Sequence, residues 1–156
     1  MASINKVGHV VLNVADVATS VAFYTQVLGM EVMRLREGSA AFLSFVTQHH
    51  DIALFKAPEG AAMGGLGLNH IAFQIDGDET ALRQLYGRLV DYGTKVDFTT
   101  DHGMTRSVYF FDPDGNRLEI FCEMMDPETG RQYMREGVNL NNRDYKPEPI
   151  LAGAAS

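Results

Sequence analysis

Cysteine is nearly absent from this 156-residue chain, and basic residues and long apolar runs are scarce. The single cysteine, Cys122, excludes a disulfide within the chain and fits a reducing, cytoplasmic compartment. Thirteen Lys and Arg against twenty Asp and Glu give a net charge of -7. Because nucleic acid binding depends on neutralising phosphates with basic side chains, we expect no nucleic acid partner.

No apolar stretch approaches the roughly 20 residues that cross a bilayer, and Met1 to Lys6 lack the apolar core of a secretory signal. The sequence therefore predicts a soluble, cytoplasmic protein with no membrane partner. Its length is that of one ordinary domain, which can bury a core without disulfides.

Two segments of the chain resemble each other. Residues 8–16, GHVVLNVAD, match residues 69–76, NHIAFQID, and each is followed by helical spacing that ends near a glycine. A repeated segment sets the architecture of a fold. We therefore expect an α+β protein built from two copies of one βαβββ module.

In the first copy, residues 9–14 are rich in β-branched side chains and predict a strand. Asp16 is expected to cap a helix that Gly29 ends. Three further strands are predicted at about residues 31–36, 40–47 and 51–56.

The second copy is expected to contain a strand near residues 69–75 and a helix at about 79–92, which Gly93 ends. Three more strands are predicted near residues 95–98, 107–111 and 117–122. The sequence Asp-Pro-Asp-Gly at 112–115 has proline and glycine where a tight hairpin turn needs them. Residues 126–145 are mostly polar and are expected to wrap the body of the protein.

Three side chains on these strands are candidate metal ligands: His9, His70 and Glu119. Because side chains alternate along a strand, both histidines are expected to point away from the apolar side chains that pack on the helices. A carboxylate in an apolar strand costs several kcal/mol unless a cation or hydrogen bonds satisfy it. A lone histidine is more often a hydrogen-bonded residue than a ligand, but two imidazoles and one carboxylate form the ligand set of non-heme Fe(II) oxygenases.

The most informative run of the chain combines a histidine, a tyrosine, a turn and a carboxylate: Thr100-Asp101-His102, Val108-Tyr109, Asp112-Pro113-Asp114-Gly115 and Glu119. In this run the chain resembles the vicinal oxygen chelate superfamily (the glyoxalase/bleomycin resistance/dioxygenase fold). Within it, the run resembles the short, single-domain type I extradiol catechol ring-cleavage dioxygenases.

The resemblance covers about Lys6 to Glu123 and implies one domain over residues 1–123. Its sheets would form a cupped, partly open mixed β-barrel with the helices outside. Module one is expected at about 6–56, a linker at about 57–67, module two at about 68–123 and a C-terminal extension at 124–156.

The resemblance also implies the roles of the site residues. His9, His70 and Glu119 would bind Fe(II), or Mn(II) in variants, and leave positions open for a catechol and O2. A further histidine is implied at the start of the fourth strand of module one. His50 matches it better than His49, which would face the other way on a strand.

His102 and Tyr109 would complete the implied site by hydrogen-bonding the substrate. His50 suits an acid–base group, because imidazole changes charge near neutral pH. Met104 and Arg106 lie between His102 and Tyr109, and either a pocket or an exposed loop would accommodate them. Cys122 is expected to point away from Glu119 and to be buried and inert.

The function that the resemblance implies is Fe(II)-dependent extradiol cleavage of a catecholic ring by O2, which gives a ring-opened semialdehyde. Simple catechols, biphenyl-type diols and side-chain-bearing catechols such as L-DOPA all fit. One alternative is a glyoxalase-like lyase or isomerase, which normally adds a glutamate ligand from the fourth strand of module one. Another is a metal-free, antibiotic-binding protein, which has no use for the three ligands. Exposed strand edges favour a homo-oligomer.

Overall fold

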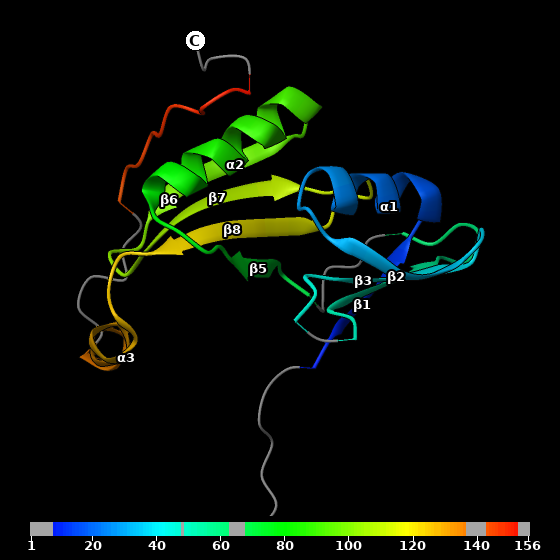
Figure 1. The fold of residues 1–156 in the computed structure, drawn as a ribbon, viewed down its shortest axis with the longest axis horizontal. Coiled ribbons are helices and arrows are strands. Elements are labelled where there is room, and N and C mark those ends of the chain that lie inside the picture. Colours follow the sequence, from blue (N-terminus) through cyan, green and yellow to red (C-terminus); the bar gives the residue numbers. More distant parts are fainter. Residues whose placement is uncertain (1–7, 48, 63–67, 137–142, 153–156) are drawn as a thin grey trace, which may run out of the picture. The chain divides into compact units, whose positions relative to one another are not determined.

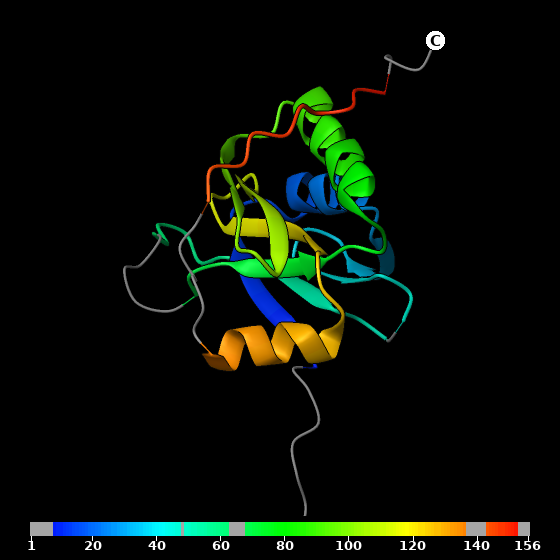
Figure 2. The same cartoon turned by 90° about the vertical axis from the view of Figure 1, so that its left-hand side faces the viewer.

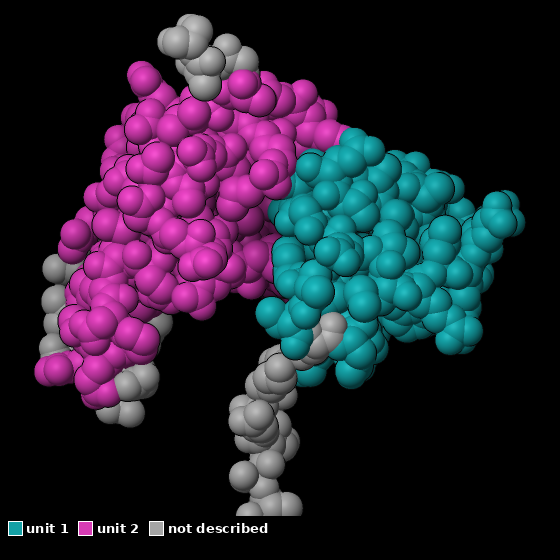
Figure 3. All heavy atoms as spheres, viewed as in Figure 1, with its two compact units in different colours: residues 1–66 teal, residues 67–156 magenta. Residues whose placement is uncertain are grey.

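A computed structural model describes residues 8–47, 49–62, 68–136 and 143–152 (Figure 1). The chain divides into two compact units, Met1–Leu66 and Gly67–Ser156, which Figure 3 shows in two colours. Each unit contains one open, four-stranded mixed sheet. The predicted α+β fold of two βαβββ modules is confirmed. Part of the expected linker, residues 63–67, lies outside the described residues.

The first unit contains five elements in the order β1 (Val10–Val14), α1 (Val17–Gln26), β2 (Glu31–Arg36), β3 (Ala40–Ser44) and β4 (Ile52–Lys56). The strand order in its sheet is β1-β4-β3-β2. Strand β1 runs parallel to β4, and the other pairs are antiparallel. Asp16 caps α1 as expected, since its carboxylate accepts the Thr19 N–H at 2.7 Å.

The predicted strand at 40–47 ends early, at Ser44. The Asp51 carboxylate accepts the Ser44 hydroxyl at 3.0 Å and the Phe45 N–H at 2.8 Å, which draws the chain out of the sheet. Val46 has a φ of 71°, a left-handed conformation that strains a β-branched residue. Residues 45–47 and 49–50 therefore lie outside the strands, and His49 and His50 precede β4.

The second unit contains β5 (Ile71–Gln74), α2 (Glu79–Tyr92), β6 (Val96–Asp101), β7 (Thr105–Phe111), β8 (Arg117–Glu123) and α3 (Pro127–Glu136). The strand order is β5-β8-β7-β6, with β5 parallel to β8. Asp78 caps α2, and Gly93 ends it with a φ of 78°. No helix among the described residues is long and apolar enough to cross a membrane.

Helix α3 is the element that the sequence prediction missed, because the polar composition of residues 126–145 suggested only a wrapping segment. Asp126 accepts the N–H groups of Glu128 and Thr129, and Pro127 occupies the first helical position. That pairing of an Asp cap with a following proline is a helix-start signal. In Figures 1 and 2, α3 lies on the opposite side of the sheet of the second unit from α2.

The two modules share an irregularity as well as a topology. Met33 is an extra residue in β2, between Val32 and Arg34, where β2 pairs with β3. Asp97 is the corresponding extra residue in β6. A β-bulge at the same place in both modules supports the repeat that the sequence predicts.

Candidate active site

One face of the sheet in the second unit carries most of the candidate side chains. Leu118 and Ile120 of β8 are buried on the face that packs against α2. Glu119 lies between them and points to the other face. In the sheet register, Glu119 lies between Ala72 of β5 and Tyr109 of β7. The register thus places a carboxylate and a phenol side by side.

His70 completes a close pair with Glu119. It precedes β5, and its Nε2 lies 3.1 Å from Oε2 of Glu119. Its other ring nitrogen, Nδ1, lies 2.8 Å from Oδ1 of Asn69, an acceptor that requires the N–H at Nδ1. When the imidazole is neutral, Nε2 therefore presents a lone pair to the carboxylate.

Two electron-pair donors at this distance need a positive charge between them, either a proton or a metal ion. Glu119 is only 6% exposed, so water does little to screen its charge. A metal-binding histidine commonly donates its second ring N–H to a neighbouring acceptor, as Asn69 allows here. The donor set of this pair thus fits a divalent transition metal.

Tyr109 stands next to this pair and is 7% exposed. Its hydroxyl lies 3.2 Å from Nε2 of His102. Burial, and then the negative charge of Glu119 and a hydrogen bond to it, raise the pKa of Tyr109. The Tyr109 ring stacks on Phe98, with 4.3 Å between ring centroids. Tyr109 is therefore a protonated, rigidly held hydrogen-bond donor.

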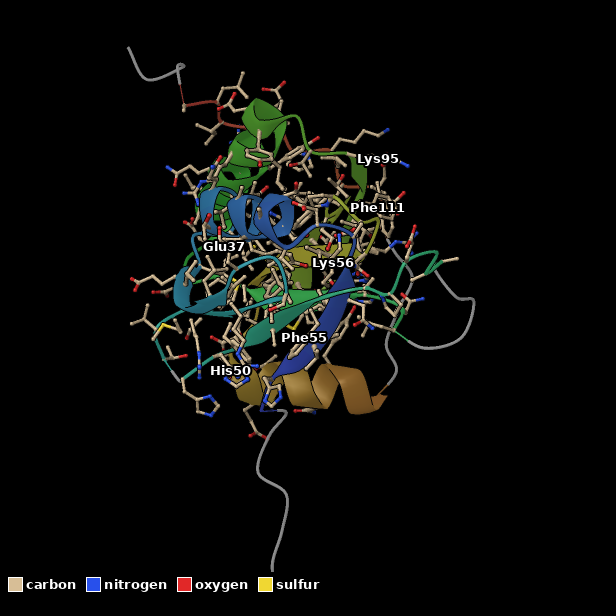
Figure 4. All side chains as sticks on the ribbon, turned by 90° about the vertical axis from the view of Figure 1, so that its right-hand side faces the viewer. Glu37, His50, Phe55, Lys56, Lys95 and Phe111 are labelled. Atoms are coloured by element: carbon tan, nitrogen blue, oxygen red, sulfur yellow. The ribbon has the colours of Figure 1, made fainter. Side chains whose placement is uncertain are left out.

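The first unit holds a separate cluster of imidazoles. The rings of His9 and His50 are 4.4 Å apart between centroids, and Phe42 meets His50 edge-on at 5.4 Å. His50 precedes β4, and Phe55 lies further along that strand (Figure 4). Desolvation, and then the neighbouring His49 and His9, lower the pKa of His50.

His49 does not face away from His50 as expected. Its Nδ1 lies 2.5 Å from Nδ1 of His50. The expectation used the alternation of a strand, but both residues belong to the loop before β4, where alternation does not apply. His49 is a neighbour of the predicted acid–base residue.

The structure groups the predicted site residues by unit. His70, His102, Tyr109 and Glu119 come together in the second unit, and His9 and His50 in the first. Among the described residues, no group of three His, Cys, Asp or Glu side chains is arranged to hold a metal ion. The pair His70 and Glu119 is the part of the expected ligand set that one unit assembles.

Arg106 and Cys122, two of the other residues considered from the sequence, lie on the α2 side of the same sheet. Arg106 makes ion pairs with Glu79, the first residue of α2, and with Asp101 at 3.3 Å, so it does not share the face of Tyr109. Cys122 is fully buried, as predicted, and burial raises the pKa of its thiol. The sequence did not predict that Phe98 packs on Tyr109, because this contact depends on the register between β6 and β7.

Comparison with known proteins identifies the superfamily of this chain. The model of the glyoxalase/bleomycin resistance protein/dioxygenase superfamily matches residues 6–120. The chain belongs to this superfamily. The crystal structure of a glyoxylase/bleomycin resistance protein/dioxygenase domain from Frankia sp. EAN1pec is similar, with a TM-score of 0.64 and 27% identity over 78% of this chain and 99% of that one.

Two curated relatives within the superfamily carry different names. Biphenyl-2,3-diol 1,2-dioxygenase 2 of Rhodococcus globerulus is 31% identical, and the match covers 96% of this chain and 77% of the relative. Lactoylglutathione lyase of Salmonella typhimurium is 30% identical, and the match covers 72% of this chain and 88% of the relative. Sequence similarity therefore supports an enzyme of this superfamily without choosing between ring cleavage and a lyase reaction.

Proposed function

We propose that the protein is an Fe(II)-dependent extradiol dioxygenase that cleaves a catecholic ring. The observation that carries this proposal is the buried carboxylate of Glu119 facing Nε2 of His70 at 3.1 Å, beside the protonated phenol of Tyr109. Similarity to the Rhodococcus dioxygenase supports the same reaction.

His70 and Glu119, together with His9 of the first unit, would hold Fe(II), or Mn(II) in variants. When bound, the ion supplies positive charge and open coordination positions for the two catechol oxygens and O2. The remaining tasks fall to side chains of the chain itself.

Tyr109 and His102 are suited to orient the substrate. The raised pKa of Tyr109 keeps the proton on its hydroxyl, so this group can turn from Glu119 and donate its one hydrogen bond to a deprotonated catechol oxygen. His102 can fix the direction of that hydroxyl by donating an Nε2–H to the phenol oxygen, which is 3.2 Å away. Phe98, stacked on Tyr109, keeps the phenol ring in place.

His50 is the proposed acid–base residue. Its lowered pKa favours the neutral imidazole at neutral pH, the form that can take a proton from a catechol hydroxyl. The protonated ring can return that proton later in the reaction. In the balanced reaction one ring C–C bond next to the hydroxyls breaks, and both atoms of O2 enter a single semialdehyde product.

The test is oxygen uptake by anaerobically handled protein loaded with Fe(II) and given a panel of catechols. We expect uptake together with the yellow absorbance of a ring-opened semialdehyde. Protein loaded with Zn²⁺, which has no redox chemistry, is the matched control and should consume no oxygen. Iron-loaded protein that turns over none of the catechols would contradict the proposal.

A glyoxalase-like lyase is the second candidate, because of the similarity to the Salmonella enzyme. Such enzymes normally need a further glutamate from the fourth strand of module one. In the fourth strand of module one, Ala53 occupies the place that Glu119 has in module two, because Ala53 pairs with Val11 as Glu119 pairs with Ala72. The nearby Asp51 carboxylate already accepts hydrogen bonds from the Ser44 hydroxyl and the Phe45 N–H. The first module therefore offers no free carboxylate at the position that the lyase would use.

A further inference from the structure

The turn that carries His102 is held from two sides by the C-terminal extension. It joins β6 to β7, and His102 N–H donates to the Thr105 carbonyl at 2.9 Å. Gly103 adopts a φ of 83°, and its N–H donates to Oδ1 of Asp101 at 2.6 Å. The placement of His102 beside Tyr109 thus depends on Asp101 and Gly103.

On one side, Tyr133 of α3 lies against Gly103. A Cβ at residue 103 would lie 2.9 Å from the ring carbon that bears the Tyr133 hydroxyl, and closer still to the hydroxyl itself. Only glycine leaves this room, and only glycine adopts the φ without strain. Tyr133 therefore sits directly behind the residue that follows His102.

On the other side, Arg143 and Tyr145 bind the edge of β6, Arg143 through an isolated β-bridge to Asp101. Arg143 N–H donates to the Asp101 carbonyl at 2.9 Å, and Asp101 N–H donates to the Arg143 carbonyl at 3.3 Å. Thr99 donates its hydroxyl to the Tyr145 carbonyl. The described chain after α3 thus pairs with the strand end that leads into the His102 turn.

Tyr145 connects this edge to α2 through charged side chains that are partly exposed. Its hydroxyl donates to Oε1 of Glu79 at 3.1 Å, while Oε2 of Glu79 pairs with Arg106. Arg106 also binds Asp101 at 3.3 Å and lies over the Tyr145 ring, 5.2 Å from its centroid. The network ends on the same Asp101 carboxylate that accepts the Gly103 N–H.

We propose that Tyr133 and Tyr145 of the C-terminal extension are positioning residues that fix the His102 imidazole against Tyr109. The inference rests on the proposed function for its effect on turnover, but the position of His102 can be measured without it. Tyr133 lies against Gly103, and Tyr145 binds Thr99 at the edge of β6 and Glu79 of α2, so both would act through the 101–105 turn.

The experiment measures two properties of the full-length, metal-free protein: the imidazole NMR signals of His102 and the hydrogen exchange rate of the Gly103 amide. We expect Tyr133→Ala and Tyr145→Phe each to shift the His102 signals and to speed Gly103 exchange about tenfold. Gly103→Ala should shift the same signals by displacing Tyr133. Tyr92→Phe is the control, because it removes a hydroxyl at the far end of α2, about 20 Å from Glu79.

A second readout uses the iron-loaded enzyme. Misplacing His102 should lower kcat several-fold at unchanged iron content, whereas a purely structural role would lower the melting temperature and leave the His102 signals in place. Unchanged signals and exchange in both tyrosine variants would overturn the inference. If wild-type protein cleaves no catechol, the proposed function fails, but the NMR and exchange results still decide the role of the extension.

Discussion

The two modules of this chain have the same topology and the same bulge, yet they contribute different chemistry. At matching places in the two sheets, Ala53 stands where module two has Glu119, and Phe42 stands where it has Tyr109. Module one offers imidazoles at the start of its strands, and module two adds the carboxylate and the phenol. The two modules thus share a fold but differ in a few side chains on the sheet face opposite their helices.

The modules also differ in how their outer strands are covered. In the second unit, residues 143–145 pair with the edge of β6. The corresponding strand of the first unit, β2, is exposed at all six residues, including Val32, Met33 and Leu35. The extension thus contacts the outer strand of the module that carries most of the candidate site.

Glu119→Ala should have the largest effect, because it removes a proposed iron ligand. The variant gives module two the alanine that module one has at the matching position, Ala53. We expect loss of bound iron and a fall in kcat/KM of at least about a thousandfold. Metal analysis and oxygen uptake measure both. Glu123→Ala, an exposed carboxylate on the same strand, should retain both properties. Full iron content in the Glu119 variant would remove this residue from the ligand set.

His50→Ala should come next, because it removes the acid–base group that we propose for module one. We expect iron to stay bound and kcat to fall about a hundredfold or more. The neighbouring variant His49→Ala should lower kcat only a few-fold, since His49 is exposed and only contacts the proposed base His50. Equal losses in the two variants would show that the assignment of the base to His50 is wrong.

Tyr109→Phe gives module two the phenylalanine that module one has at the matching position, Phe42. The ring and its stacking on Phe98 persist, so the melting temperature should change little. Loss of the donated hydrogen bond should lower kcat about tenfold to a hundredfold. Steady-state kinetics on a catechol would measure this, and unchanged kcat would exclude a role for the hydroxyl.

The smallest effects concern the two hairpin turns, each of which is tied by an aspartate. Asp112 accepts the N–H groups of Asp114 and Asn116, as Asp51 does for Phe45. Alanine at either position should cost about 1–3 kcal/mol of the free energy of unfolding, measured with urea. Only Asp51→Ala should also slow turnover, because its loop carries His50. Slower turnover in the Asp112 variant alone would reverse this comparison.

Most of the fold follows from local signals in the sequence. The Asp16 cap and the glycine at 93 are where they were predicted, whereas α1 ends at Gln26, before the predicted stop at Gly29. Strand β6 runs on to Asp101, beyond the predicted end, because pairing with β7 and with Arg143 supports it. Helix α3 was missed because a polar composition outweighed its Asp-Pro start signal.

Less of the candidate site could be predicted, for a physical reason. Alternation along a strand tells which face His70 and Glu119 share, but it does not give their separation. The neighbours Phe98 and Tyr133 depend on a bulged register and on a contact across 30 residues, neither of which has a local sequence pattern. The orientation of His49 was also not predicted, because His49 and His50 precede β4 and the alternation of side chains along a strand does not apply to them.

The most direct test of the proposed reaction is the mass of the product formed from one catechol under ¹⁸O-labelled O2. Extradiol cleavage predicts a single ring-opened product whose formula is that of the catechol plus both atoms of O2, with label retained in its carboxylate. A product with the mass of the substrate, formed without oxygen consumption, would contradict the dioxygenase assignment and favour the lyase reaction.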